Sequence, residues 1–157
     1  MSCVRRFAQV VAILALFVAR LAAAELPAGW IGLFDATGRC FYAVPPRWKI
    51  DDLFKVSEPI AASPDGRVTA TISWSEQHSW SWFTARLREA LRPTVVFEDS
   101  ATRFWVEYRD SRLAISQLSA VPNPGGSCMF EIAANDPVTD ETRRILRAVV
   151  DTVTSIR

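Results

Sequence analysis

Four strand-like segments follow one another between two helical segments, and this order constrains the fold more than any other feature of the sequence. The segments are TVVFEDS (94–100), TRFWVEYRD (102–110), RLAISQLSAV (112–121) and SCMFEIAA (127–134). Each is rich in the aromatic and β-branched residues that strands favour. The middle two are expected to form a hairpin around Asp110-Ser111. This succession predicts an antiparallel sheet in which neighbours in sequence pair with one another.

The pairing of that hairpin determines which side chains are buried. If Arg109 pairs with Arg112, then Phe104, Val106 and Tyr108 share one face with Leu113 and Ile115. The other face carries a mixed set of side chains: Arg103, Trp105, Glu107, Ala114 and Ser116. One face is therefore expected to be buried and the other to be mixed, as is usual for an antiparallel sheet.

Two further strand regions precede these segments. GRCFYAV (38–44) is expected to form a strand that Pro45 and Pro46 end, because proline cannot donate to a ladder. KVSEPIAASPDGRVTATISW (55–74) predicts two strands around a turn at Ser63-Pro64-Asp65-Gly66. In the second strand Val68, Ala70, Ile72 and Trp74 alternate with Thr and Ser, which indicates one apolar face.

Two helices are predicted from their ends and their apolar stripes. Ser79 is suited to cap a helix that Pro93 stops, and Asp136 with Pro137 is suited to begin a second one. The apolar stripe of the second helix consists of Ile145, Leu146, Val149, Val153 and Ile156. Together, the elements predict an α+β domain, a curved antiparallel sheet of five to seven strands with at least two helices packed on it.

Residues 1–24 have the features of a cleaved secretory signal peptide. Arg5 and Arg6 precede a 13-residue apolar run, and Ala22 and Ala24 form a small-x-small cleavage pattern before Glu25. The run is shorter than the roughly 20 residues that span a bilayer. We expect export to the periplasm or the medium, a single domain over residues 25–157 and no stable membrane insertion after cleavage.

Charge and cysteine content indicate which partners are expected and whether the chain contains a disulfide. Removing the signal removes three of 18 basic residues and leaves 15 against 17 acidic ones, a formal charge of −2. Such a chain lacks the basic field that nucleic-acid binding requires, so no nucleic-acid partner is expected. The two remaining cysteines, Cys40 and Cys128, are expected to form a disulfide, because an even count in an exported protein favours pairing. Two buried free thiols are the alternative.

WSEQHSWSW (74–82) contains three of the six tryptophans and the single histidine. Trp74 and Trp80 fall on the apolar faces of a strand and a helix, so both are expected in the core. Trp82 lies about 130° from the middle of the helix stripe, beside Arg86 and Glu89. It is either covered by another segment or exposed as a protein-binding residue. Trp105, with Arg103 on the mixed face of its strand, is a second candidate for partner binding.

Catalytic and metal sites find little support in the sequence. His78 is the single histidine of the chain, so no second histidine can complete a metal site with it. No nucleophile turn of the G-x-S-x-G kind accompanies it. The pairs Asp51-Asp52 and Glu98-Asp99 project to opposite sides of the backbone and form no acid–base dyad. We expect no metal, no cofactor and no enzymatic activity.

The order of these motifs resembles the PsbP-like family, named after an extrinsic subunit of photosystem II. CFYAVPPRWKI (40–50) is similar to its opening strand, DGRVTATISWSE (65–76) to its second hairpin, and RRILRAVVDTVTSI (143–156) to its terminal helix. The resemblance implies a helix–sheet–helix sandwich that acts as a binding or assembly module without catalytic residues of its own. Exported bacterial versions include envelope lipoproteins and immunity-type proteins.

The leading hypothesis is therefore a non-enzymatic binding protein that contacts another envelope or secreted protein, as an immunity-type inhibitor or an assembly factor. Two alternatives stay open. One is a small-ligand carrier with a pocket lined by Phe41, Trp105 or Phe130. The other is a small secreted hydrolase in which His78 acts with a nearby serine or carboxylate.

Overall fold

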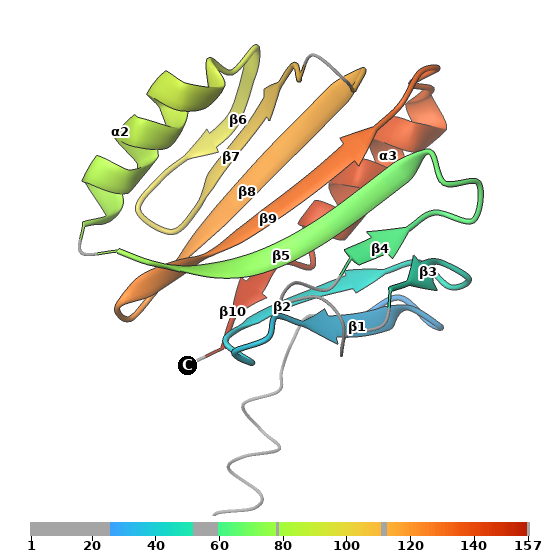
Figure 1. Ribbon diagram of the computed structural model, residues 1–157, viewed down its shortest axis with the longest axis horizontal. Coiled ribbons are helices and arrows are strands. Elements are labelled where there is room, and N and C mark those ends of the chain that lie inside the picture. The colour runs from blue at the N-terminus through green and yellow to red at the C-terminus, as the bar shows by residue number, and fades with distance from the viewer. Residues whose placement is uncertain (1–25, 52–59, 78, 111–112, 157) are drawn as a thin grey trace, which may run out of the picture.

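The computed structural model describes residues 26–51, 60–77, 79–110 and 113–156. It contains one large and one small antiparallel sheet with two helices (Figure 1). The large sheet consists of β3 (Lys49–Ile50), β4 (Ile60–Ala62), β5 (Val68–Glu76), β6 (Val95–Asp99), β7 (Phe104–Tyr108), β8 (Ile115–Asn123) and β9 (Gly126–Ala134). The small sheet consists of β1 (Ile31–Phe34), β2 (Cys40–Val44) and β10 (Thr154–Ser155). The helices are α2 (Trp80–Leu91) and α3 (Asp140–Val150).

The large sheet has the strand order β3-β4-β5-β9-β8-β7-β6. From β6 to β9 each strand pairs with its neighbour in sequence, as predicted, and β5 then pairs along its whole length with β9. The predicted α+β class, with up to seven antiparallel strands in one sheet, is confirmed. The separate small sheet was not predicted.

One face of the large sheet, which we call the α3 face, is covered by α3 and by the small sheet. In Figure 1, α3 is seen between β9 and β5, behind these strands, and the small sheet lies below β5. Buried side chains from all three parts form one core that includes Tyr42, Ile72, Phe130, Leu146 and Val149. The Tyr42 and Phe130 rings pack 5.0 Å apart, across the gap between β2 and β9. This core holds the small sheet, the large sheet and α3 together.

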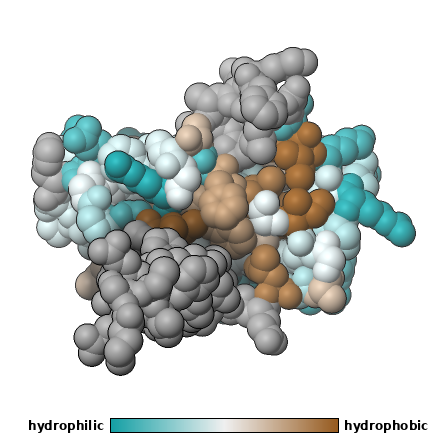
Figure 2. Space-filling model, turned by 90° about the horizontal axis from the view of Figure 1, so that it is seen from below, coloured by the Kyte–Doolittle hydropathy of each residue, from teal (hydrophilic) through white to brown (hydrophobic). Residues whose placement is uncertain are grey.

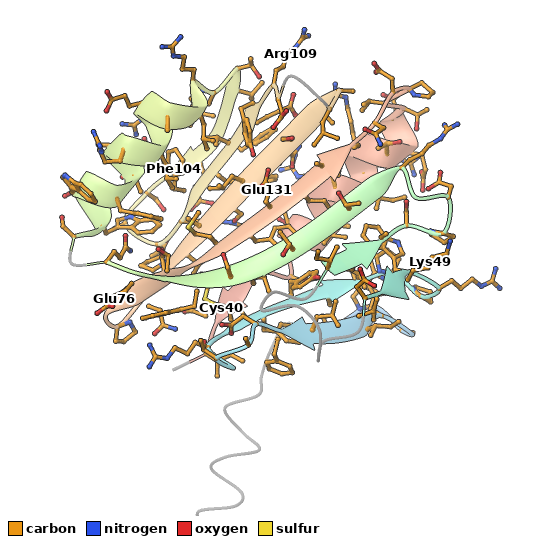
Figure 3. All side chains as sticks on the ribbon, viewed as in Figure 1. Cys40, Lys49, Glu76, Phe104, Arg109 and Glu131 are labelled. Carbon is orange, nitrogen blue, oxygen red and sulfur yellow. A yellow bond between two sulfur atoms is a disulfide. The ribbon has the colours of Figure 1, made fainter. Side chains whose placement is uncertain are left out.

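The opposite face, which we call the α2 face, is covered only in part. Its core is smaller and consists of Phe104, Val106, Tyr108, Leu118 and Ala120, with residues of α2 packed against it. Figure 3 labels Phe104 beside α2, whereas Glu131 lies farther from the helix on β9. On β5 this face carries Thr69, Thr71, Ser73 and Ser75, which are exposed or half-buried. The two faces of one sheet therefore differ in both cover and chemistry.

The turn between β8 and β9 has the residue types that its backbone conformation requires. Asn123 pairs with Gly126, so Pro124 and Gly125 form a two-residue connection. Proline suits the first central position of a type II turn, and the second requires positive φ, which Gly125 adopts at 78°. A Cβ on Gly126 would lie 2.5 Å from the Ser75 carbonyl oxygen and 2.6 Å from the Trp74 ring. This close approach lets β9 begin directly against β5.

Two predicted boundaries are wrong. The second helix begins after Thr139, not at Asp136, because Thr139 and Thr142 form a capping box in which each side chain accepts from the other's backbone N–H. It ends at Val150, since the chain turns there and β10 pairs with β2. Val153 and Ile156, which were assigned to the helix stripe, therefore lie beyond it. Ser79 and Pro93, by contrast, bound α2 as predicted.

The predicted register of the β7–β8 hairpin is also wrong. Tyr108 pairs with Ser116, so the connection is longer than two residues and runs over 109–114. A shift of the register by an odd number of residues moves every side chain of one strand to the other face. Leu118 and Ala120 therefore join Phe104 on the α2 face, while Ile115 joins Trp105 in the α3-face core.

Candidate functional site

Helix α2 is held at both ends by its own residues. The Ser79 side chain accepts a hydrogen bond from the Trp82 N–H at 3.4 Å, and the Arg92 N–H donates to the Arg88 carbonyl oxygen at 3.1 Å. The Trp80 indole N–H donates to the Ser100 carbonyl oxygen at 2.9 Å, and Arg88 forms an ion pair with Asp99. These contacts attach α2 alongside β6, at one margin of the large sheet.

The apolar stripe of α2 faces the sheet, which fixes the orientation of the rest of the helix. The residues that pack against the α2-face core are Trp80, Phe83, Leu87 and Leu91. At 100° per residue, Trp82 lies on the opposite side of the helix. Its side chain is 62% exposed, so of the two alternatives left by the sequence the structure has the exposed one.

Charged residues flank Trp82 on the outer side of α2. The Arg86 guanidinium lies 5.7 Å from the centre of the Trp82 ring, within the range of a cation–π contact. Arg86 also pairs with Glu89 at 3.3 Å. Trp82 and Arg86, which the sequence suggested as a pair, are therefore brought together by the structure.

An open hollow runs along the same helix. Its lining residues are Phe83, Arg86, Leu87, Glu89, Ala90 and Arg92. Phe83 and Leu87 supply an apolar floor, because neither is fully buried by the sheet, and the charged residues form the rim. The sequence analysis named none of Phe83, Leu87 and Ala90 as a candidate, so this part of the site was missed. We call these residues, together with Trp82, the α2 surface.

Trp105 and Arg103 do not join the α2 surface, and the expected exposure of Trp105 is wrong. Trp105 is 5% exposed and lies on the α3 face, where its ring meets Phe97 at 4.5 Å and its N–H donates to the Gln117 side-chain oxygen at 3.3 Å. The predicted mixed face of β7 is covered because α3 packs over it.

Arg103 fills the space between β7 and the end of α3. Its guanidinium lies 5.1 Å from the centre of the Trp105 ring and donates to the Val150 carbonyl oxygen at 2.5 Å and to the Ser119 hydroxyl at 3.0 Å. Burial lowers the pKa of Arg103, and the charges of Asp151 and Glu98 partly oppose this effect. These contacts make Arg103 part of the packing between helix and sheet.

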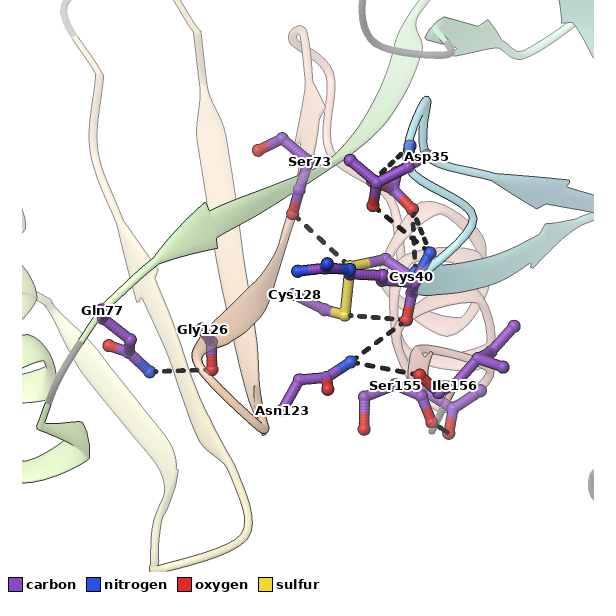
Figure 4. The surroundings of a disulfide bond; sticks show 12 residues. Asp35, Cys40, Ser73, Gln77, Asn123, Gly126, Cys128, Ser155 and Ile156 are labelled. Carbon is purple, nitrogen blue, oxygen red and sulfur yellow. Dashed lines mark hydrogen bonds between the residues drawn. A yellow bond between two sulfur atoms is a disulfide. The ribbon is translucent and has the colours of Figure 1, made fainter.

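The predicted disulfide between Cys40 and Cys128 is present. It joins β2 to β9, with Cα atoms 5.4 Å apart and 88 residues of separation in sequence (Figure 4). Nearby, the Asn123 side-chain amide donates to the carbonyl oxygens of Arg39 at 3.4 Å and Ile156 at 3.2 Å. The disulfide therefore links the small sheet to the large one at a point where three strand ends meet.

The loop before β2 is organised by Asp35. Its carboxylate accepts hydrogen bonds from the Thr37 hydroxyl and from the N–H groups of Thr37, Arg39 and Cys40. Burial alone would raise the pKa of Asp35, but these four hydrogen bonds together hold it below its ordinary value. The charged form of Asp35 is thus part of the support of the disulfide.

The residues proposed to line a ligand pocket do not converge. Phe130 is fully buried against Tyr42, whereas Phe41 points to the outer side of the small sheet, where its ring contacts Phe34 at 5.2 Å. A Cβ on Gly32 would lie 2.7 Å from the Phe41 ring, so this ring lies directly over β1. Trp105 belongs to the same α3-face core as Phe130, whereas Phe41 lies outside that core. The three rings are therefore not brought together in one place, and the ligand pocket stays a prediction.

A second exposed apolar area lies on the outer side of the small sheet. Phe34 is 48% exposed there, next to Phe41. Figure 2 views the molecule from this side and shows apolar side chains gathered near the middle of the face, bordered by polar ones. This area provides a comparison for the α2 surface in the experiments below.

His78 lies outside the described residues. The structure therefore does not describe the catalytic site of the alternative hydrolase. Among the residues that the structure describes, no three His, Cys, Asp or Glu side chains are grouped so that they could hold a metal ion. No helix in the described part of the chain is long and apolar enough to cross a membrane.

Comparison with known proteins identifies the fold. No family model matches the chain, and no curated protein matches it. Among solved structures, it is similar to cyanobacterial PsbP (CyanoP) from Synechocystis sp. PCC 6803, with a TM-score of 0.57 and 12% sequence identity. The match covers 85% of this chain and 96% of that one. The resemblance suggested by the sequence is confirmed at the level of the fold.

Proposed function

From the premise that this chain has a PsbP-like fold, we propose that it is a non-enzymatic, exported binding protein that acts by contact with another protein. The α2 surface is the site of that contact. The partner is a protein of the same compartment, the periplasm or the medium. An immunity-type inhibitor, which holds one protein partner tightly, is the most concrete form of this function, and an envelope assembly factor is the other.

The observation that carries the proposal is the position of Trp82. This side chain is 62% exposed, lies on the outer side of α2 and contributes nothing to either core. Tryptophan and arginine are the residues most enriched among those that dominate binding energy in protein interfaces. Trp82 and Arg86 stand next to each other and are both accessible.

The hollow beside Trp82 supports the same conclusion. Protein interfaces combine an apolar centre with a polar rim, and binding residues lie near well-packed pockets. Phe83 and Leu87 provide the apolar floor, and Arg86, Glu89 and Arg92 provide the rim. A protruding side chain of a partner would have a place to enter next to Arg86, whose guanidinium contacts the exposed indole.

The compartment is proposed from two features. The signal-like residues 1–24 favour export, and the disulfide between Cys40 and Cys128 suits an oxidising environment. The small formal charge of the chain without its signal argues against a nucleic-acid partner.

The test is affinity capture from a periplasmic extract of the source organism, followed by measurement of binding with the purified partner. Wild type, Trp82→Ala and Phe34→Ala are compared, because Phe34 is an exposed aromatic residue of the small sheet. We expect one protein to be captured by wild type and Phe34→Ala. Trp82→Ala should weaken its binding at least about 30-fold, the effect of a residue worth roughly 2 kcal/mol.

Three results would count against the proposal. The first is capture of nothing above background by the wild type. The second is equal binding by wild type and Trp82→Ala. The third is loss of binding in Phe34→Ala alone, which would move the interface to the small sheet.

A further inference from the structure

The outer side of the small sheet exposes apolar side chains from three adjacent strands. Phe34 of β1 is 48% exposed, and the half-buried Phe41 of β2 lies opposite it, with ring centres 5.2 Å apart. Thr154 of β10 pairs with Phe41, so Ile156, two residues further along the chain, projects to the same side and is 37% exposed. We call Phe34, Phe41 and Ile156 the small-sheet patch. Contiguous apolar areas with polar margins mark protein or membrane contacts.

The segment that carries the small sheet is basic, although the chain as a whole is not. Of the 15 basic and 17 acidic residues outside the signal, residues 26–51 contain three basic and two acidic ones. All three basic side chains, Arg39, Arg47 and Lys49, are exposed, whereas Asp35 is buried in its loop and only Asp51 is an exposed acid. The rest of the chain has 12 basic and 15 acidic residues. Positive charge is therefore concentrated around the small sheet.

The basic residues stand at both ends of the small sheet. Arg39 immediately precedes β2, and Arg47 follows it in the turn that leads to Lys49 in β3. Figure 2 shows apolar side chains in the middle of this side and hydrophilic ones at its margins. Peripheral membrane binding combines the same two components, because apolar side chains enter the boundary of the bilayer and basic ones are attracted to anionic lipids.

The length of chain before β1 brings the same part of the molecule close to a membrane during export. The predicted signal ends at residue 24 and β1 begins at Ile31, and seven residues of extended chain span at most about 25 Å. As long as the signal is in the bilayer, the small sheet stays within roughly that distance of it. This proximity favours a lipid surface over a protein as the occupant of the small-sheet patch.

We propose that the small-sheet patch is a membrane-contact surface that binds peripherally to bilayers containing anionic phospholipids. The Phe34 and Phe41 rings and the Ile156 side chain enter the boundary between headgroups and acyl chains. The basic side chains Arg47 and Lys49 are attracted to the lipid phosphates at the same time. With so few side chains of each kind, the binding is weak and reversible, and the chain does not insert across the bilayer.

The inference is independent of the function proposed for α2. In Figure 1, α2 lies at the upper left and the small sheet lies at the bottom, below β5. A molecule that rests on a membrane through the small sheet would leave Trp82 accessible to a protein partner. Binding to vesicles is measured with the purified chain alone, so its result does not depend on whether a partner is found.

The test is flotation of the purified mature chain, residues 25–157, with vesicles over a range of lipid concentrations. One set of vesicles consists of phosphatidylcholine alone, and the other contains about 30% phosphatidylglycerol as the anionic lipid. We expect the wild type to bind the anionic vesicles at least about fivefold more strongly than the neutral ones. Salt at about 1 M, where the Debye length is about 3 Å, should remove most of this difference.

Two variants and two matched controls locate the contact. Phe34→Ser should lower the partition coefficient on anionic vesicles about fivefold, because the ring no longer enters the bilayer boundary. Lys49→Glu should lower it at least about fivefold. Val96→Ser, at an equally exposed apolar position of β6, and Arg109→Glu, at the upper end of the large sheet in Figure 3, should each leave it within about twofold. Circular dichroism and thermal unfolding show that each variant is folded.

A wild type that floats with neither set of vesicles overturns the proposal. So does binding that Phe34→Ser does not weaken, since the contact would then lie elsewhere. Equal losses in Lys49→Glu and Arg109→Glu would mean that only net charge matters, and equal binding to both sets of vesicles would exclude anionic lipid as the ligand. Either result would also overturn the proposal.

Discussion

Helices α3 and α2 have nearly the same length, 11 and 12 residues, yet they are buried against the sheet to different extents. Leu146, Val149 and Val150 of α3 are fully buried in a core shared with the small sheet. In α2 the one buried residue is Thr84, and the apolar stripe stays partly accessible. The sheet is thus a well-covered structural layer on one face and a lightly covered support on the other.

This difference separates stability from recognition. Burial of apolar surface supplies most of the free energy of folding, so substitutions on the α3 face should lower stability. Substitutions on the outer side of α2 should leave stability unchanged and alter binding.

Removal of the disulfide should have the largest effect. Replacing both Cys40 and Cys128 by serine removes a link between positions 88 residues apart in sequence. This should lower the free energy of unfolding by about 4–5 kcal/mol in the chain-entropy description. Urea unfolding of the double variant measures the loss, and reduction of the wild type should give a similar value. A loss below about 1 kcal/mol would show that the link between the two sheets contributes little.

Truncation of one leucine in each helix should give unequal losses. Leu146→Ala removes a fully buried side chain and should cost about 3–4 kcal/mol, whereas Leu87→Ala, at a half-buried position, should cost about 1 kcal/mol. Chemical denaturation of both variants provides the comparison. Equal losses would contradict the distinction between the two faces.

Neutralisation of Asp35 should give a smaller loss that depends on pH. Asp35→Asn weakens the hydrogen bonds that support Cys40 and should cost about 1–3 kcal/mol at pH 7. Because the pKa of Asp35 is lowered on folding, the charged carboxylate stabilises the fold above its unfolded pKa of about 3.9. That stabilisation is lost as the pH falls through the lower, folded pKa.

The difference between wild type and Asp35→Asn should therefore be constant from pH 7 to about 5 and should shrink below about pH 4. Unfolding free energies measured across this range check the sign. A difference that grows on acidification would contradict the hydrogen-bonded arrangement of the carboxylate.

Truncation of Trp82 should have the smallest effect on stability. Trp82→Ala should change the free energy of unfolding by no more than about 0.5 kcal/mol, because the side chain is mostly exposed and joins neither core. Thermal and chemical unfolding measure this directly. A loss above about 2 kcal/mol would mean that Trp82 is a structural residue.

The sequence predicted elements best where local chemistry decides them. Ser79 and Pro93 bound α2 because a cap and a missing N–H act on the adjacent turn alone. The disulfide between Cys40 and Cys128 was predicted from the even number of cysteines outside the signal. The beginning of α3 was misplaced because Asp136-Pro137 and Thr139 both offer cap chemistry; the reciprocal bonds of Thr139 with Thr142 fix the start, and these are also local.

Predictions failed where distant parts of the chain decide the outcome. The register of β7 and β8 changed the face of Ile115, since apolar residues at both parities are compatible with either pairing. Trp105 was expected at the surface, but α3 covers it. Phe83 and Leu87 stay half-buried at the margin of the α2-face core. Val95, Val96 and Phe97 are exposed on the last strand of the large sheet, and their run without polar alternation was the one local sign of it.

The central claim is that the α2 surface meets the partner and the outer side of the small sheet does not. Photocrosslinking in living cells tests it most directly, with a photoreactive side chain placed at Glu89, which pairs with Arg86 on the α2 surface, or at Phe34 on the small sheet. The account predicts one discrete adduct to another protein from position 89, absent when Trp82 is also replaced by alanine. An adduct from position 34 alone, or none from position 89, would contradict it.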